Sequence, residues 1–232
     1  MEAETAKRQF LEYIEIERGR AVKTVENYDH YLARYFAQMK IKNVGDISEQ
    51  NIREFRLWLN RQSGTGGESM KRRTQNYYMV ALRAFLKFLR KRSIECISPE
   101  RIELAKLPER ELDLITPAEL GRLMGAAHGM GEKDLRNTAI LALFFSTGLR
   151  VSELCSLNSD IDLTQDSFSV RGKGDKVRIV FLSPTATGAV AAYLKVRKDM
   201  GEALFVSVPI GKTIPSRLTS RSIERIIKKC AV

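Results

Sequence analysis

The sequence predicts a mainly α-helical protein with two domains, the second of which contains a small antiparallel sheet. Three observations support this prediction. Apolar residues recur at helical spacing through most of residues 4–92, a stretch with proline and many charges follows at 98–115, and two strand-like segments flank a glycine-rich turn at 172–176. With 232 residues, of which 44% are hydrophobic, the chain is long enough to bury a core in each domain.

The first three helices are predicted from apolar spacing and capping residues. Apolar side chains at 10–16 indicate the first helix, and Thr24 is expected to cap a second helix over 25–39. Ser48 can cap a third helix, and the glycine-rich run at 64–67 predicts the turn that follows it.

A fourth helix is predicted over about 69–92, and its two faces differ in character. One face gathers the apolar side chains Tyr78, Leu82, Phe85, Leu86 and Leu89. The opposite face carries the cations Arg72, Arg73, Arg83, Lys87, Arg90 and Lys91. No acidic residue lies between Ser69 and Arg92, so no neighbour on the helix neutralises these cations. This face is either simply solvated, as most charged helix faces are, or it binds phosphates, and the single sign of its charge favours phosphates.

A second domain is expected to begin after the extended connection at 98–115. Thr116 supplies an N-cap, Pro117 the first helical position and Glu119 the carboxylate of a capping box. The next helix, over about 132–146, is predicted to be buried centrally because it is apolar nearly all round. Its apolar residues are Ile140, Leu141, Leu143, Phe144 and Phe145.

The rest of the second domain mixes strands with helices. Alternating or continuous apolar residues predict strands over 167–170 and 178–182, joined by a hairpin at 172–176. A helix follows over 185–200, and Thr219 can cap a last helix.

The net charge indicates the class of partner. The chain has 39 Lys and Arg against 28 Asp and Glu, which gives a net charge of +11. A globular protein this basic favours polyanions, so a nucleic acid is the expected partner, ahead of the alternative that the charge only keeps the protein in solution. No stretch approaches the ~18–20 continuous apolar residues of a membrane span, and no signal-peptide pattern opens the chain. We therefore expect a cytoplasmic protein with no membrane association.

The cysteines and histidines predict neither a disulfide framework nor a metal site. The three cysteines are odd in number and far apart, and two histidines are too few for a His-based metal site. These residues are Cys96, Cys155, Cys230, His30 and His128.

Two short motifs carry the candidate chemistry. Arg150 follows an apolar helix and the glycine that ends it, so its guanidinium is expected in a partly enclosed place, where its planar fork suits a phosphate. Glu153 either orients this arginine or neutralises it in an internal ion pair. Lys173 lies between two glycines at the predicted hairpin tip, where the backbone can approach a ligand closely, although such turns are also common surface loops.

The order of these features resembles the tyrosine recombinase family, most closely its Xer type. A basic helical domain and a proline-containing linker precede a Thr-Pro-x-Glu restart, and then come Thr-Gly-Leu-Arg-x-Ser-Glu-Leu at 147–154 and Gly-Lys-Gly-x-Lys-x-Arg at 172–178. The resemblance implies a SAM-like core-binding domain over 1–97, a linker over 98–115 and part of a catalytic domain over 116–232. It also implies site-specific recombination at a double-stranded DNA site, self-association into a tetramer on that DNA, and no metal or small-molecule cofactor.

The same resemblance implies roles for individual residues. Arg150 takes the place of the first catalytic arginine, which holds the scissile phosphate and stabilises its developing charge. Lys173 takes the place of the hairpin lysine that donates a proton to the leaving 5′ oxygen. The expected DNA-binding residues are Lys71, Arg72, Arg73, Arg83, Lys87, Arg90, Lys91 and Lys176.

The second half of that family's catalytic site is not found in the sequence. A His-x-x-Arg box, another His or Trp, and the nucleophilic Tyr should follow, whereas none of the seven tyrosines stands in that context. We therefore expect a fragment of a recombinase that binds duplex DNA and does not cleave it alone. The alternatives are a non-catalytic DNA-binding accessory protein on the same scaffold, and an RNA-binding helical protein, which the lack of an aromatic stacking platform disfavours.

Overall fold

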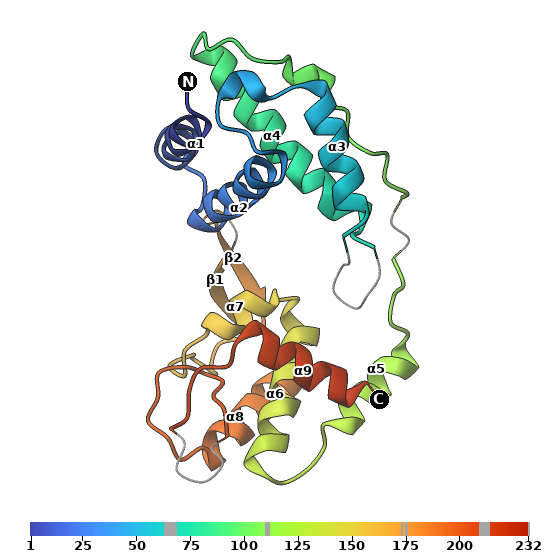
Figure 1. Cartoon of the computed structure of the whole chain (residues 1–232). Helices are drawn as coiled ribbons and strands as arrows, with labels where there is room; N and C mark the ends of the chain where they lie inside the picture. The colour runs from blue at the N-terminus through green and yellow to red at the C-terminus, as the bar shows by residue number, and fades with distance from the viewer. Residues whose placement is uncertain (63–68, 110–111, 173, 175, 209–213, 232) are drawn as a thin grey trace. The chain divides into compact units, whose positions relative to one another are not determined.

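The computed structural model describes residues 1–62, 69–109, 112–172, 174, 176–208 and 214–231 (Figure 1). The chain divides into two compact units, which we call unit 1 (Met1–Glu111) and unit 2 (Leu112–Val232). Helices dominate the described part of both units, and its one sheet is a two-stranded antiparallel hairpin in unit 2. The predicted fold class is therefore confirmed.

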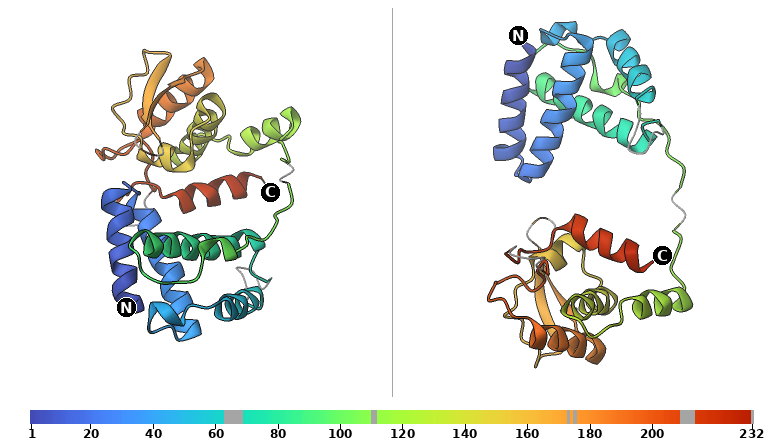
Figure 2. Two further views of the ribbon diagram at one scale, coloured as in Figure 1. Left: turned by 90° about the horizontal axis from the view of Figure 1, so that it is seen from above. Right: turned by 60° about the horizontal axis from the view of Figure 1, so that its bottom comes forward.

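Unit 1 is a helical bundle. Its elements are α1 (Ala3–Glu12), a π-helical turn (Tyr13–Glu17), α2 (Val22–Met39), a 3-10 turn (Val44–Asp46), α3 (Glu49–Asn60), α4 (Arg72–Lys91) and a second 3-10 turn (Pro99–Arg101). α1 and α2 lie side by side, and α4 packs against both (Figure 2). The ring of Phe85 on α4 lies 5.6 Å from that of Phe10 and 5.8 Å from that of Phe36, so aromatic packing joins the three helices.

The predicted apolar face of α4 forms part of this core. All five of its residues are at most 4% exposed: Tyr78, Leu82, Phe85, Leu86 and Leu89. The cap of α3 is also as predicted, because the Ser48 hydroxyl accepts a hydrogen bond from the Asn51 amide at 3.2 Å. The predicted cap at Thr24 is wrong, since α2 begins at Val22 and the Thr24 amide donates to the Ala21 carbonyl. The turn predicted at 64–67 lies outside the described residues.

Part of the connection expected to be an extended linker packs onto unit 1. Ile102 is fully buried in the core of this unit, and its carbonyl accepts a hydrogen bond from the Arg83 guanidinium. Further on, the Asn76 side chain and the Ala105 backbone exchange two hydrogen bonds of 2.9 Å each. An apolar side chain of this segment is buried in unit 1, and backbone polar groups of the segment are hydrogen-bonded there. The chain from about Ser98 to Ala105 is therefore structurally part of unit 1.

Unit 2 combines helices with the hairpin. Its elements are α5 (Pro117–Ala126), α6 (Glu132–Thr147), α7 (Val151–Ser156), β1 (Ser167–Arg171), β2 (Val177–Phe181), α8 (Pro184–Val196) and α9 (Ser220–Cys230). α6 and α8 pack side by side, and α9 packs against α5 and α7 (Figure 1). The predicted capping box of α5 is confirmed, because Thr116 and Glu119 exchange backbone-to-side-chain hydrogen bonds of 2.8 and 3.3 Å. Thr219 caps α9 as predicted.

The burial of α6 is less complete than the sequence predicts. Ile140, Leu141 and Leu143 are buried, but Phe145 is 69% exposed. The helix packs against α8, β2 and α5, but these contacts leave Phe145 uncovered, and Phe145 lines an open apolar groove together with residues of α5. The helix predicted over 185–200 also ends earlier, at Val196.

The predicted hairpin is confirmed, and its strands β1 and β2 pair antiparallel. Ser167 pairs with Phe181 and Arg171 pairs with Val177, and the Gly172 amide donates to the Lys176 carbonyl at 2.8 Å. Gly174 in the turn has φ 71°, a left-handed conformation that favours glycine.

Candidate active site

The backbone around Arg150 turns sharply between two helices. α6 ends at Thr147, its C-cap residue Gly148 has φ 60°, and the side chain of the following residue, Leu149, is buried. Arg150 then has extended dihedral angles and stands at the N-cap of α7. α6 thus ends just before Gly148, α7 begins at Val151, and Arg150 lies at the junction between the two helices.

Glu153, on the first turn of α7, is the centre of the site. Its side chain is 5% exposed, and its carboxylate accepts four hydrogen bonds from the described residues. The Arg150 amide donates to Oε2 at 2.8 Å and the Arg150 Nη1 donates to Oε1 at 2.8 Å. Arg178 of β2 donates from Nη1 to Oε1 at 2.9 Å and from Nη2 to Oε2 at 2.8 Å. These donors, first Arg178 and then Arg150, lower the pKa of Glu153 to about 2.

Arg150 itself is more open than the sequence predicts. Its side chain is 62% exposed, so the expectation of a partly enclosed guanidinium is wrong and the buried member of the pair is Glu153. Nη1 contacts Glu153, and the other guanidinium donors have no protein partner among the described residues. A guanidinium that is anchored at one nitrogen and open at its other donors can bind the oxygens of a phosphate.

Lys173 lies outside the described residues, but its neighbours on the hairpin are described. A Cβ atom on Gly172 would lie 2.9 Å from Glu153 Oε1 and 3.6 Å from Arg150 Nη1. The hairpin turn therefore begins directly beside the carboxylate and the arginine. Lys176, at the other end of the turn, is exposed.

In unit 1 the predicted DNA-binding cations are exposed with one exception. The exposed residues are Lys71, Arg72, Arg73, Lys87, Arg90 and Lys91. Arg83 is half-buried and donates a hydrogen bond to the Ile102 carbonyl, so its guanidinium contacts the protein itself instead of being open to solvent.

This face of α4 has an acidic neighbour that comes from outside the helix. No acid lies on the helix itself, but Glu100 comes within 3.8 Å of Arg90 from the segment that packs onto unit 1. Lys91 is close to the Tyr13 hydroxyl, at 3.5 Å. Arg72 and Arg73, at the start of α4, have no ion-pair partner among the described residues.

Sequence reasoning missed one further cation of unit 1. Arg34 on α2 lies 4.8 Å above the ring of Trp58, and its Nη1 donates to the Tyr78 hydroxyl at 2.8 Å. It is held by aromatic groups, and no acid pairs with it among the described residues. The helical spacing of Tyr31, Arg34 and Tyr35 was the available signal, but the position of Trp58 depends on the tertiary fold.

The described part of the chain has no metal-binding group, no disulfide and no helix that could span a membrane. It contains no group of three or more His, Cys, Asp or Glu side chains that could hold a metal ion, and its three cysteines are free. Within the same residues, no helix has the length and apolar character needed to cross a bilayer.

Comparison with known proteins identifies both units. The model described as the phage integrase family matches residues 113–232, and the model described as the phage integrase N-terminal SAM-like domain matches residues 8–93. The SAM-like character predicted for the N-terminal half is thus confirmed.

Relatives and solved structures agree with these matches. The tyrosine recombinase XerC of Bacillus pumilus is 32% identical over 188 residues, which cover 80% of this chain and 61% of that protein. XerC of Corynebacterium efficiens is 30% identical over 229 residues, which cover 96% of this chain and 69% of that protein. The chain thus spans about three fifths of the length of the first relative.

A solved structure of lambda integrase bound to DNA shares the fold at 16% identity, with a TM-score of 0.71 over 100% of this chain and 78% of that one. The order of the two matched family models is the order of the two units, and the second model includes both the Arg150 motif and the hairpin. The chain therefore belongs to the phage integrase family of tyrosine recombinases.

Proposed function

We propose that this protein takes part in site-specific DNA recombination, in which unit 1 holds duplex DNA and Arg150 binds the phosphate where a strand is broken and rejoined. The observation that carries the proposal is the Arg150 guanidinium, which buried Glu153 holds at one nitrogen while most of the side chain stays exposed. An arginine oriented in this way can stabilise the charge that develops on phosphate oxygens in the transition state.

We assign Lys173 the protonation of the leaving 5′ oxygen. The position of Gly172 beside Glu153 and Arg150 supports this assignment, because the turn that carries the lysine starts there. Lys176 and the exposed cations of α4 are assigned to backbone phosphates, which position a protein on DNA without reading its sequence.

We further propose that several copies assemble on a double-stranded recombination site in the cytoplasm. Lambda integrase, whose fold this chain shares, has been solved as a tetramer bound to a Holliday junction.

A non-catalytic DNA-binding role is the second candidate, and the burial of three of the seven tyrosines favours it for the 232 residues alone. Tyr35 and Tyr193 are at most 1% exposed, and burial raises the pKa of both hydroxyl groups. Tyr78 accepts a hydrogen bond from Arg34 and is 4% exposed. None of these three can reach a DNA phosphate without rearrangement.

Two experiments test the proposal. If about six to eight phosphates are contacted, the logarithm of the DNA-binding constant should fall against the logarithm of salt concentration with a slope of roughly −5 to −7. An affinity that does not respond to salt would contradict the DNA-binding part.

The catalytic part is tested with a nicked suicide substrate that carries a recombination site. The 232 residues alone should bind it without forming a covalent adduct. Fusion to the C-terminal segment of a XerC relative should produce the adduct, and Arg150→Ala in the fusion should abolish it. An adduct formed by the 232 residues alone would show that one of the seven tyrosines is a nucleophile.

A further inference from the structure

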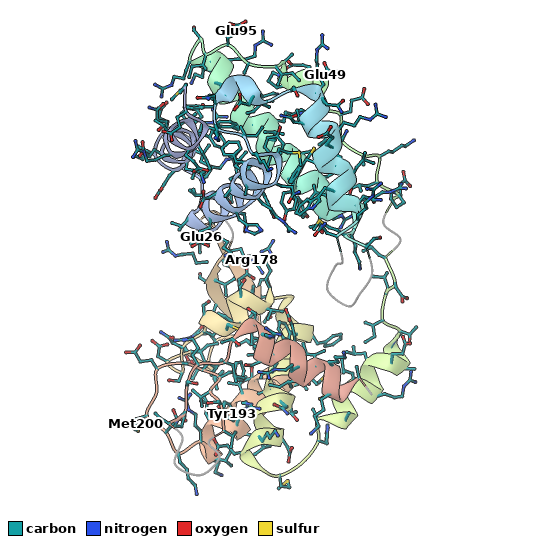
Figure 3. The ribbon with its side chains drawn as sticks, in the orientation of Figure 1. Glu26, Glu49, Glu95, Arg178, Tyr193 and Met200 are labelled. Carbon is teal, nitrogen blue, oxygen red and sulfur yellow. The ribbon has the colours of Figure 1, made fainter. Side chains whose placement is uncertain are left out.

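Arg178 is the second arginine at Glu153, and it binds the carboxylate more completely than Arg150 does. It lies on β2 beside α7 (Figure 3). Each of its two outer nitrogens donates to a different oxygen of Glu153, at 2.9 and 2.8 Å, whereas the Arg150 guanidinium contributes one nitrogen. The Arg178 side chain is 36% exposed, against 62% for Arg150.

This difference matters because a carboxylate binds an arginine best through two parallel hydrogen bonds. Arg178 occupies that two-point arrangement, so Arg150 is left with a single contact from its guanidinium. Without Arg178, Arg150 would be the remaining ion-pair partner of Glu153 among the described residues. A buried carboxylate needs its partners, so Glu153 would then draw the Arg150 guanidinium inward into a two-point pair.

The hairpin is joined to the same cluster. A Cβ atom on Gly172 would lie 2.9 Å from Glu153 Oε1 and 3.2 Å from Arg178 Nη1, so the chain passes close to the ion pair as it enters the turn. Arg178 lies five positions after Lys173 in the sequence of this hairpin. The salt link from β2 to α7 therefore fastens the base of the turn beside Arg150.

We propose that Arg178 is a positioning residue, which satisfies Glu153 so that Arg150 stays available to a phosphate and which holds the hairpin turn beside it. The inference rests on the proposed function, because it concerns how Arg150 is presented to DNA. Arg178 is not expected to contact the phosphate, since both of its outer nitrogens are engaged by Glu153.

The test follows the Arg150 Nε–H signal in the NMR spectrum of the 15N-arginine-labelled chain during titration with inorganic phosphate. The signal is assigned from Arg150→Lys. Arg178→Gln should weaken phosphate binding at Arg150 by about tenfold, the effect of losing one charge-assisted hydrogen bond. Arg178→Lys, which keeps the charge but not the two-point geometry, should fall between wild type and Arg178→Gln.

The double variant Glu153→Gln with Arg178→Gln separates positioning from a merely structural role. Removal of the carboxylate also removes the group that draws Arg150 inward, so phosphate affinity should recover to within about threefold of wild type. A structural role predicts a further loss instead. Arg122→Gln removes one exposed charge from α5 of the same unit and serves as the matched control, with no change expected.

Two results would overturn the inference. One is a folded Arg178→Gln variant that binds phosphate as well as wild type does, and the other is a double variant that binds more weakly than the single one. Salt-dependent binding of duplex DNA by wild type distinguishes these results from failure of the proposed function. A wild-type chain that binds neither DNA nor phosphate would contradict both proposals.

Discussion

The two units hold their arginines in opposite ways. In unit 2, Arg150 and Arg178 converge on one carboxylate that is 5% exposed. In unit 1, the cations of α4 are spread along the helix, and the acid that approaches Arg90 is itself 70% exposed. Exposed ion pairs contribute little to stability because water screens them, whereas a buried carboxylate must keep its partners.

This difference suggests two kinds of contribution to one function. Exposed cations can exchange weak partners for phosphates independently of one another, so their effects on DNA binding should be nearly additive. The arginines of unit 2 share one carboxylate, so a change at either should alter the other. The following predictions test this contrast, from the largest expected effect to the smallest.

Replacement of Arg72, Arg73 and Lys87 together by Ala should produce the largest effect, on DNA affinity. If each contacts one phosphate, affinity at about 0.1 M salt should fall by roughly two to three orders of magnitude, and the salt slope should become less negative by about 3. Fluorescence anisotropy on several duplexes should show the same loss for each, because these contacts are to the backbone. A loss restricted to one sequence would contradict their assignment to phosphates.

Glu153→Gln should destabilise unit 2 by about 2 kcal/mol, since the two arginines lose a shared acceptor of charge-assisted hydrogen bonds.

The variant should also alter the pH dependence of unfolding. The pKa of Glu153 is lowered from 4.5 to about 2, so its ionised form stabilises the folded state above about pH 4.5, and this stabilisation is lost as the pH falls toward 2. Thermal unfolding between pH 4.5 and 2 should therefore decline less steeply in Glu153→Gln than in wild type. Parallel curves would contradict the role of the carboxylate.

Gly172→Ala should destabilise unit 2 by about 1–2 kcal/mol, because the new Cβ would press against Glu153 and Arg178 at 2.9 and 3.2 Å. Gly188→Ala is the matched control. Gly188 lies within α8, no atom lies within 4 Å of a Cβ placed there, and the change should stabilise the helix by about 0.5–1 kcal/mol. Chemical denaturation of both variants measures the difference, and equal effects would show that the hairpin is not tightly fitted to the ion-pair cluster.

Glu17→Gln should have the smallest effect. Its ion pair with Arg92 spans 3.0 Å, but the two side chains are 51% and 54% exposed, so the free energy of unfolding should change by less than about 0.5 kcal/mol. Chemical denaturation of the variant checks this value. A larger loss would mean that the exposed pairs of unit 1 are organised more like the cluster of unit 2.

Local features of the fold were determined by the sequence itself. The caps at Ser48, Thr116 and Thr219, the apolar face of α4 and the hairpin follow from residues within a few positions of one another, and the structure agrees with all of them. Family membership was likewise readable from the Arg150 motif and the hairpin motif, because both are short and continuous.

Contacts between distant segments were decided only by the tertiary structure. Which elements pack together decides that Glu100 approaches Arg90 and that the Ile102 carbonyl accepts a hydrogen bond from Arg83. It also decides that Phe145 stays exposed in an apolar groove. The same holds for Glu153 and Arg178, which are 25 positions apart on a helix and a strand. The sequence identified Arg150 as the chemical group. Its exposure and orientation depend on the buried carboxylate of Glu153, whose second partner, Arg178, comes from a different element. Periodicity and capping carry no information about such pairings.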